Sequence, residues 1–293
     1  MKKILLLLVT LNTTISFGSI QVKTTLPELN WLATEIGGEL VKSSSLLSGH
    51  EDPHFVDVTP AFIFKIKSID ILIKNGLALE STWLPKIIEL SGNQKLLSLG
   101  LCDASTNLDT LGELEKTDRS MGDVHPEGNP HYTYSPKQMI LASRAIANCF
   151  QKYDPSNLAI YESNFSKIKD QLTLLVNSVE SRLSSFKQIN IMTYHEEFKY
   201  FCHDFNLSCI NTLEDTPGIL PSASNMVKKT LFVKEKKVKF VLATDSNPKR
   251  ILSKFSELSG IKYAQVEAHM NTRIKSYSDF VLQIVRVIEK HGK

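Results

Sequence analysis

The stretch that decides the fold is residues 155–186, which read PSNLAIYESNFSKIKDQLTLLVNSVESRLSSF. After Pro155 this stretch contains no Pro or Gly, and its apolar residues recur three and four positions apart, as on one face of a helix. They are Leu158, Tyr161, Phe165, Ile168, Leu172, Leu175, Val179 and Leu183. The pattern predicts one helix far longer than the average helix of a globular protein. Because it lies mid-chain, we expect it to join two halves.

Short apolar strands alternate with helical segments on both sides of this helix. The expected strands are residues 20–24, a run ending at 46–47, 69–73, 95–99, 189–192, 207–210, 239–243 and 263–266. The expected helices include residues 27–36, 83–90, 136–150 and 277–289. Such alternation predicts an α/β fold with parallel sheets and helical crossovers, in which ligands bind outside the carboxyl ends of the strands.

The first residues predict export from the cytoplasm. Lys2 and Lys3 precede an apolar run at residues 4–9, and small residues follow up to Ser19. This is the layout of a secretory signal peptide cleaved near Ser19, and its apolar run is too short for a permanent membrane span. An uncleaved anchor is the alternative. No Cys follows the run directly, so we expect a periplasmic protein rather than a lipoprotein.

The expected organisation is therefore a signal peptide at residues 1–19, a first α/β lobe at 20–154, a connecting helix at 155–187 and a second α/β lobe at 188–293.

Composition excludes some classes of function. The chain has 293 residues, 42% of them hydrophobic and 22% charged, as is ordinary for a globular protein. A net charge of +3 without a concentrated basic face argues against nucleic-acid binding. Among four cysteines, Cys202 and Cys209 are near in sequence, and either a disulfide or buried free thiols would suit them.

Three of the eight histidines, His54, His131 and His195, fall in loops after expected strands. Pro53 and Pro130 precede the first two and stiffen their loops. Three neutral imidazoles from separated segments suit a borderline-soft divalent ion such as Zn²⁺ or Mn²⁺. Spacing alone does not establish the site, because each histidine taken singly also suits a hydrogen-bonded loop position.

Several ordered motifs point to one family. They are Asp52-Pro53-His54 with Thr59-Pro60; Asn75-Gly76-Leu77-Ala78-Leu79-Glu80 with Trp83; Gly122-Asp123-Val124-His125-Pro126-Glu127-Gly128-Asn129-Pro130-His131-Tyr132; Asp154-Pro155 with Tyr161 and Asn164; and Tyr194-His195 with Phe198, Tyr200-Phe201, Pro217-Gly218 and Pro221-Ser222. With these motifs, nearly the whole chain resembles the periplasmic solute-binding proteins of manganese- and zinc-type ABC importers.

The resemblance implies two Rossmann-like lobes joined by one rigid helix, with one divalent metal ion in the cleft between the lobes. His54 and His131 from the first lobe and His195 from the second would bind it. The usual late acidic ligand is missing, so His269, then Asp245 or a water, is expected to be the fourth ligand. Asp245 also suits a cap of the helix after Pro248.

The cargo and the partner follow from the same resemblance. Zinc or manganese is expected, with ferrous iron also acceptable to the ligand set. The protein is expected to be a monomer that delivers the ion to the membrane permease of an ABC importer. Because imidazole binds metal when neutral, the affinity should fall as the pH drops through about 6.5.

The remaining histidines have simpler interpretations. His50 and His125 are close to the metal loops and suit accessory groups, although surface exposure is favoured for both. His203 is expected to be structural, and His291 to be exposed near the terminus.

Two other functions compete with metal delivery. One is an exported zinc metalloenzyme with a three-His site, in which Glu196 beside His195 would be the general base. The other is a surface adhesin, for which no residue argues directly.

Overall fold

The computed structural model describes residues 18–114 and 125–293. Residues 1–17, which hold most of the expected signal peptide, lie outside these ranges. Within the described ranges, no helix combines the length and apolar character needed to cross a membrane.

The first lobe is built on a four-stranded parallel sheet with the order β2-β1-β3-β4. Its strands are β1 (Ile20–Thr24), β2 (Val41–Ser45), β3 (Ile71–Lys74) and β4 (Leu101–Asp103). In β3 the residues Ile71, Leu72 and Ile73 are all fully buried, as expected for a strand covered on both faces. The expected parallel sheets are thereby confirmed.

Proline begins each α-helix of this lobe or occupies its first turn, where its missing N–H costs nothing. The α-helices are α1 (Pro27–Gly37), α2 (Pro60–Ile66), α3 (Leu84–Ser91) and α4 (Pro136–Tyr153). Short 3₁₀ turns are η1 (Gly38–Leu40), η2 (Gln94–Leu97) and η4 (Tyr132–Tyr134).

The second lobe repeats this topology with the order β6-β5-β7-β8, again all parallel. Its strands are β5 (Asn190–Thr193), β6 (Ser208–Thr212), β7 (Phe240–Thr244) and β8 (Lys262–Val266). Its helices are η7 (Glu196–Phe198), α6 (Lys199–Asp204), α7 (Ala223–Glu235), α8 (Lys249–Ser259) and α9 (Tyr277–His291). In both lobes the strand order reverses beside the first strand, which is where open α/β sheets place their ligands.

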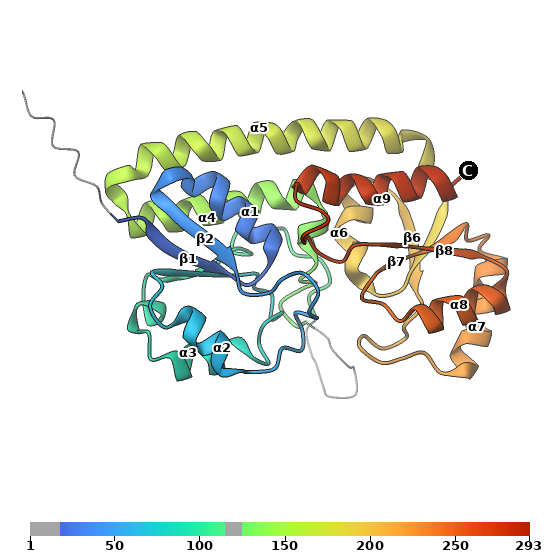
Figure 1. Cartoon of the computed structure of the whole chain (residues 1–293). Coiled ribbons are helices and arrows are strands. Elements are labelled where there is room, and N and C mark those ends of the chain that lie inside the picture. Colours follow the sequence, from blue (N-terminus) through green and yellow to red (C-terminus); the bar gives the residue numbers. More distant parts are fainter. Residues whose placement is uncertain (1–17, 115–124) are drawn as a thin grey trace, which may run out of the picture.

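The long helix predicted from periodicity is α5 (Leu158–Leu183), which the 3₁₀ turns η5 (Pro155–Asn157) and η6 (Ser184–Phe186) extend at both ends. It runs along both lobes (Figure 1), packing on α1 and α4 of the first and on α9 of the second. Ion pairs join it to both: Arg144 to Glu162 at 2.7 Å, and Arg182 to Glu289 at 2.6 Å. The helix therefore connects the two lobes through contacts with each of them.

One expected strand is wrong. Residues 95–99 form most of the 3₁₀ turn η2, and the strand β4 begins only at Leu101. The Asn93 side chain accepts the backbone N–H of Lys95 and so starts a turn. Leu97 and Leu99 are exposed, and of this run only Leu96 enters the core. Tertiary packing here overrides a local β pattern.

All four cysteines form disulfides. Cys102 in β4 is bonded to Cys149 in α4, and Cys202 in α6 to Cys209 in β6. Of the two states open for Cys202 and Cys209, the structure has the disulfide. Each bridge ties a helix to a sheet strand of its own lobe, as is typical of proteins in oxidising compartments.

The lobes also meet directly near α9. Trp31 of α1 stacks on Tyr277 of α9, with ring centroids 5.0 Å apart. The Tyr277 hydroxyl donates to the Thr133 carbonyl at 2.9 Å. Gly49, at a φ of +90°, lies so close to the Met270 carbonyl that an added Cβ would be 2.2 Å from that oxygen. Glycine therefore permits the close approach of the loop after β2 to the second lobe.

Candidate metal centre

His54 lies in the loop between β2 and α2 and is held on both sides. Its backbone N–H and its ring Nδ1 both lie within hydrogen-bond distance of Asp52 Oδ1, at 3.0 and 2.8 Å. The His54 carbonyl accepts from the Thr82 hydroxyl at 2.7 Å, and the Pro53 carbonyl accepts from the Trp83 indole at 2.8 Å. The carboxylate at Nδ1 favours the tautomer with its proton there and the lone pair on Nε2.

His131 is positioned by the loop that leads into η4. Its backbone N–H donates to Asn129 Oδ1 at 2.9 Å. Asn75 follows β3, and its side-chain N–H donates to the Pro130 carbonyl at 3.0 Å. The backbone carbonyl of Asn75 accepts from the Tyr132 hydroxyl at 2.9 Å. The turn after β3 thus fixes the residues on either side of His131.

His195 follows β5 directly and belongs to the second lobe. Its carbonyl accepts from the Thr193 hydroxyl at 2.7 Å, and its backbone N–H donates to Glu197 at 3.1 Å. Its ring Nδ1 lies 2.9 Å from Glu214 Oε2. Glu214 was not predicted, although it comes two residues after β6, the neighbour of β5, and that position is a signal that the sequence offered.

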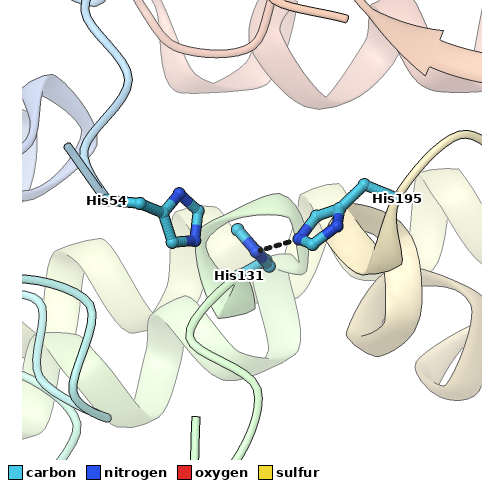
Figure 2. A group of neighbouring side chains, drawn as sticks. All are labelled: His54, His131 and His195. Atoms are coloured by element: carbon cyan, nitrogen blue, oxygen red, sulfur yellow. Dashed lines mark hydrogen bonds between the residues drawn. The ribbon is translucent and has the colours of Figure 1, made fainter. Parts of the chain in front are cut away.

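The three predicted histidines converge between the lobes. One potential ligand atom from each of His54, His131 and His195 can be chosen so that all lie within 4.8 Å of one another. Figure 2 shows the rings facing one another from three separate loops, with His131 Nε2 3.2 Å from His195 Nε2. Two nitrogens bound tetrahedrally to zinc lie about 3.3 Å apart, given Zn–N bonds of about 2.0–2.1 Å. The spacing therefore suits a single ion with small side-chain movements.

The pKa values of His131 and His195 are shifted in opposite directions. Burial and the neighbouring imidazoles of His195 and His54 hold the pKa of His131 well below its usual range. Burial alone would also lower the pKa of His195, but the hydrogen bond to Glu214 and the charge of Glu197 outweigh it and raise this pKa to about 9. Without a bound metal ion, His195 therefore carries a proton near neutral pH and donates to Glu214 and to His131.

The two residues expected as fourth ligands face the same cavity but have other partners. A cavity of about 500 Å³ is lined by the three histidines together with Asp245 and His269. His269 Nδ1 lies 3.3 Å from the buried Glu28 carboxylate. Asp245 accepts the backbone N–H of Ala268 at 2.9 Å and pairs with Arg273 at 3.3 Å. Neither belongs to the close group formed by the three histidines.

His125 occupies a position that the sequence did not indicate. Its ring centroid lies 5.2 Å from that of His54 and 6.4 Å from that of His131. Surface exposure was favoured for this residue, but its Nε2 is buried, because the loop before His131 folds back against the cluster. Burial, followed by the charges of His54 and His195, lowers the pKa of His125 to about 3, so its ring is neutral.

His203 and His291 have partners away from the cluster, whereas His50 lines the same cavity as the three histidines. His50 is exposed, as expected. His203 pairs with Asp204 at 3.0 Å, and the ring of His291 packs on Phe240 at 5.6 Å between centroids.

Known proteins with similar sequences bind metals. The chain is similar to the zinc-binding lipoprotein AdcA of Streptococcus pneumoniae serotype 4, with 24% identity over 275 residues that cover 89% of this chain and 54% of AdcA. It thus spans about half the length of that relative. It is also similar to the manganese ABC transporter substrate-binding lipoprotein scaA of Streptococcus gordonii, with 25% identity over 241 residues, 76% of this chain and 72% of scaA.

Solved structures and a family profile agree with the fold. The crystal structure of ZnuA superposes with a TM-score of 0.80 and 22% identity, covering 94% of this chain and 100% of that chain. The profile of the family described as zinc-uptake complex component A, periplasmic, matches residues 22–291. The resemblance inferred from the motifs is confirmed, and the chain belongs to the family of periplasmic zinc-uptake complex component A.

Proposed function

We propose that this protein captures one divalent transition metal ion with His54, His131 and His195 and delivers it to the permease of an ABC importer. The observation that carries the proposal is the convergence of three imidazoles, with ligand atoms within 4.8 Å, on loops from two lobes. Neutral imidazole nitrogens suit zinc, manganese and ferrous iron, and oxygen partners on Asp52 and Glu214 orient two of the rings as metal-binding histidines require.

The names of the relatives support this cargo and this partner. AdcA is named for zinc, and scaA for manganese and for an ABC transporter. We take zinc or manganese as the cargo, a periplasmic location reached through the signal peptide at residues 1–19, and a monomer as the working state. Iron is a third cargo that the ligands accept.

Release follows from the division of the ligands between lobes. His54 and His131 belong to the lobe at residues 20–154, and His195 to the lobe at 188–293, with residues 155–187 as the connection. A shift of either lobe or of the His195 loop would withdraw one ligand from the other two and loosen the ion.

The position of Glu196, which the metalloenzyme alternative requires as general base, does not support that alternative. Glu196, the expected general base, is paired with Lys199 at 3.0 Å, and its carbonyl accepts from Asn129 at 3.1 Å. A base for metal-bound water should instead reach the reacting proton.

Elemental analysis and metal titration test the proposal. Protein purified from its native compartment should carry about one equivalent of a single transition metal, and His54→Ala, His131→Ala and His195→Ala should each lose it. His50→Ala is the matched control on the same loop, because His50 is exposed. Absence of metal in the native protein, together with no tight binding on titration, would overturn the proposal.

A further inference from the structure

A fourth imidazole lies beside the three converging histidines. The His125 ring is as close to His54, at 5.2 Å between centroids, as His131 is to His54, also 5.2 Å. His125 comes from the same loop as His131, six residues earlier in the chain. It faces a second cavity of about 390 Å³, which His131 and His195 also line. The cluster thus lies between two cavities, with His125 on the side away from His269 and Asp245.

The buried Nε2 of His125 needs an explanation. Within the described part of the chain this nitrogen has no hydrogen-bond partner. Leaving a buried polar atom unsatisfied costs about 1–3 kcal/mol, so native structures rarely tolerate it without a reason. A neutral imidazole nitrogen with an unused lone pair, in a ring that lies beside two other imidazoles, has the chemistry of a metal ligand.

The other nitrogen of this ring is already oriented. The backbone of Ala78 forms a hydrogen bond with His125 that favours the protonated ring, so the ring donates and the Ala78 carbonyl accepts. Since Nε2 is unpartnered, the donor is Nδ1. A ring Nδ1–H donated to a carbonyl leaves the lone pair on Nε2, which is how metal-binding histidines are commonly fixed. His54 and His195 have equivalent oxygen partners, in Asp52 and Glu214.

The turn that presents the Ala78 carbonyl is strained and internally braced. Leu77 and Ala78 have positive φ values of 50° and 59°, which non-glycine residues rarely adopt. The buried Glu80 carboxylate holds the turn by accepting the backbone N–H groups of Asn75 at 2.6 Å and Gly76 at 3.1 Å. Backbone strain of this kind persists where the surroundings enforce it, and it clusters at functional sites.

The two rival fourth ligands are less well placed than His125. The Asp245 carboxylate accepts a backbone N–H and pairs with Arg273, so binding a metal would cost it these partners. His269 is paired with Glu28 through Nδ1, which leaves its Nε2 available, but in the described part of the chain its ring makes no ring contact with the three histidines, whereas the ring of His125 lies beside those of His54 and His131. His125 lies outside the group within 4.8 Å, so its ring must advance toward the other three to bind.

Resting on the function proposed above, we propose that His125 supplies the fourth ligand of the metal centre, making a donor set of four imidazole nitrogens that favours zinc over manganese. Four nitrogen ligands suit tetrahedral zinc, whereas manganese prefers carboxylate, carbonyl and water oxygens. The selectivity for zinc is thereby assigned to one residue at the edge of the site.

The test compares zinc and manganese binding in His125→Ala with the unaltered protein, by competition with a chromophoric chelator. Zinc affinity should fall about 10- to 100-fold, the range seen when the partners of a metal site are lost, while manganese affinity changes little. His125→Asp should restore a fourth ligand as oxygen and lower the zinc-to-manganese affinity ratio. The visible spectrum of bound Co²⁺ should report loss of four-coordinate geometry in His125→Ala. Unchanged melting temperatures would show that each variant is folded.

Two matched variants make the outcome decisive. His50→Ala removes an exposed histidine and His269→Ala removes the rival ligand, and both should keep the zinc affinity and the Co²⁺ spectrum of the unaltered protein. If His125→Ala binds zinc normally, or if the loss follows His269 instead, the inference is overturned. Failure of the unaltered protein to bind either metal overturns the proposed function as well, whereas binding that needs His195 but not His125 overturns this inference alone.

Discussion

Replacing Glu214 by Gln is expected to uncouple metal binding from proton release. His195 lies between two partners, with Nδ1 2.9 Å from Glu214 and Nε2 3.2 Å from His131. The pKa of His195 is raised to about 9, so a metal ion that binds its Nε2 at neutral pH must displace a proton. The substitution Glu214→Gln would keep the shape of the side chain but remove the hydrogen-bonded carboxylate that, together with the charge of Glu197, retains this proton.

The size of the effect follows from the pKa. At pH 7, two units below a pKa of about 9, removing the proton costs about 3 kcal/mol. Metal affinity should therefore rise about tenfold per pH unit up to pH 9, and level off above it. The decline on acidification thus begins well above the value near 6.5 expected for an unperturbed histidine. In Glu214→Gln the pKa should move back toward 6.5, and the pH dependence with it.

Isothermal titration calorimetry with zinc, in buffers of different ionisation enthalpy, measures the released protons. At pH 8 the unaltered protein should release about 0.9 proton per ion, whereas the release from Glu214→Gln should fall toward about 0.03 proton as its pKa approaches 6.5. Glu196→Gln is the matched control, because Glu196 contributes least among the carboxylates that raise the pKa of His195 and is paired with Lys199, so this variant should change the release far less than Glu214→Gln. Equal proton release from Glu214→Gln and the unaltered protein would refute the reasoning.

Three further outcomes are expected. The pKa of His195 is raised on folding, so in protein freed of metal by a chelator its pair with Glu214 should add up to about 3 kcal/mol of stability below pH 6.5. This stability should be lost as the pH rises through 9, and denaturant titrations of His195→Gln should lack the change. Free zinc at 100 times its Kd should raise the free energy of unfolding by about 2.7 kcal/mol, and an unchanged melting temperature would argue against an ion that bridges the lobes. Glu28→Gln should weaken the bonds to His269 and Met270 and cost about 1–3 kcal/mol in urea unfolding, whereas a neutral result would mean that this buried contact does not brace the lobes.

Local sequence patterns predicted most of the helices and strands. The helix at residues 155–186 was predicted because its apolar spacing is continuous, and seven of the eight residues in that pattern are buried, the exception being Leu158. The expected strand at 95–99 failed because a short segment with three leucines in five residues does not show whether it is covered. Its neighbour Asn93, a residue that starts turns, was the stronger signal.

The site was predictable only in part, for a different reason. His54, His131 and His195 were predicted because each lies in a loop after an expected strand and within a family motif. The residues that contact the site, in contrast, depend on contacts that span the chain. Glu28 meets His269 across 241 residues, a pairing that neither periodicity nor spacing encodes. The burial of His125 likewise depends on how its loop folds over the turn at Ala78.

The arrangement of the centre suggests how a rigid frame can still release its cargo. The helix α5 is paired to both lobes, and Trp31 stacks on Tyr277 across the interface, so a large rotation of one lobe would break these contacts. His195, in contrast, sits on a loop and has two alternative occupants for its Nε2, a metal ion or a proton shared with His131. When a proton replaces the metal ion on Nε2, the charged His195 ring donates from Nδ1 to Glu214 and from Nε2 to His131. Removal of the metal ion therefore leaves no unpaired charge behind. Exchange of the ion for a proton at this one ring would therefore open the site with little motion elsewhere.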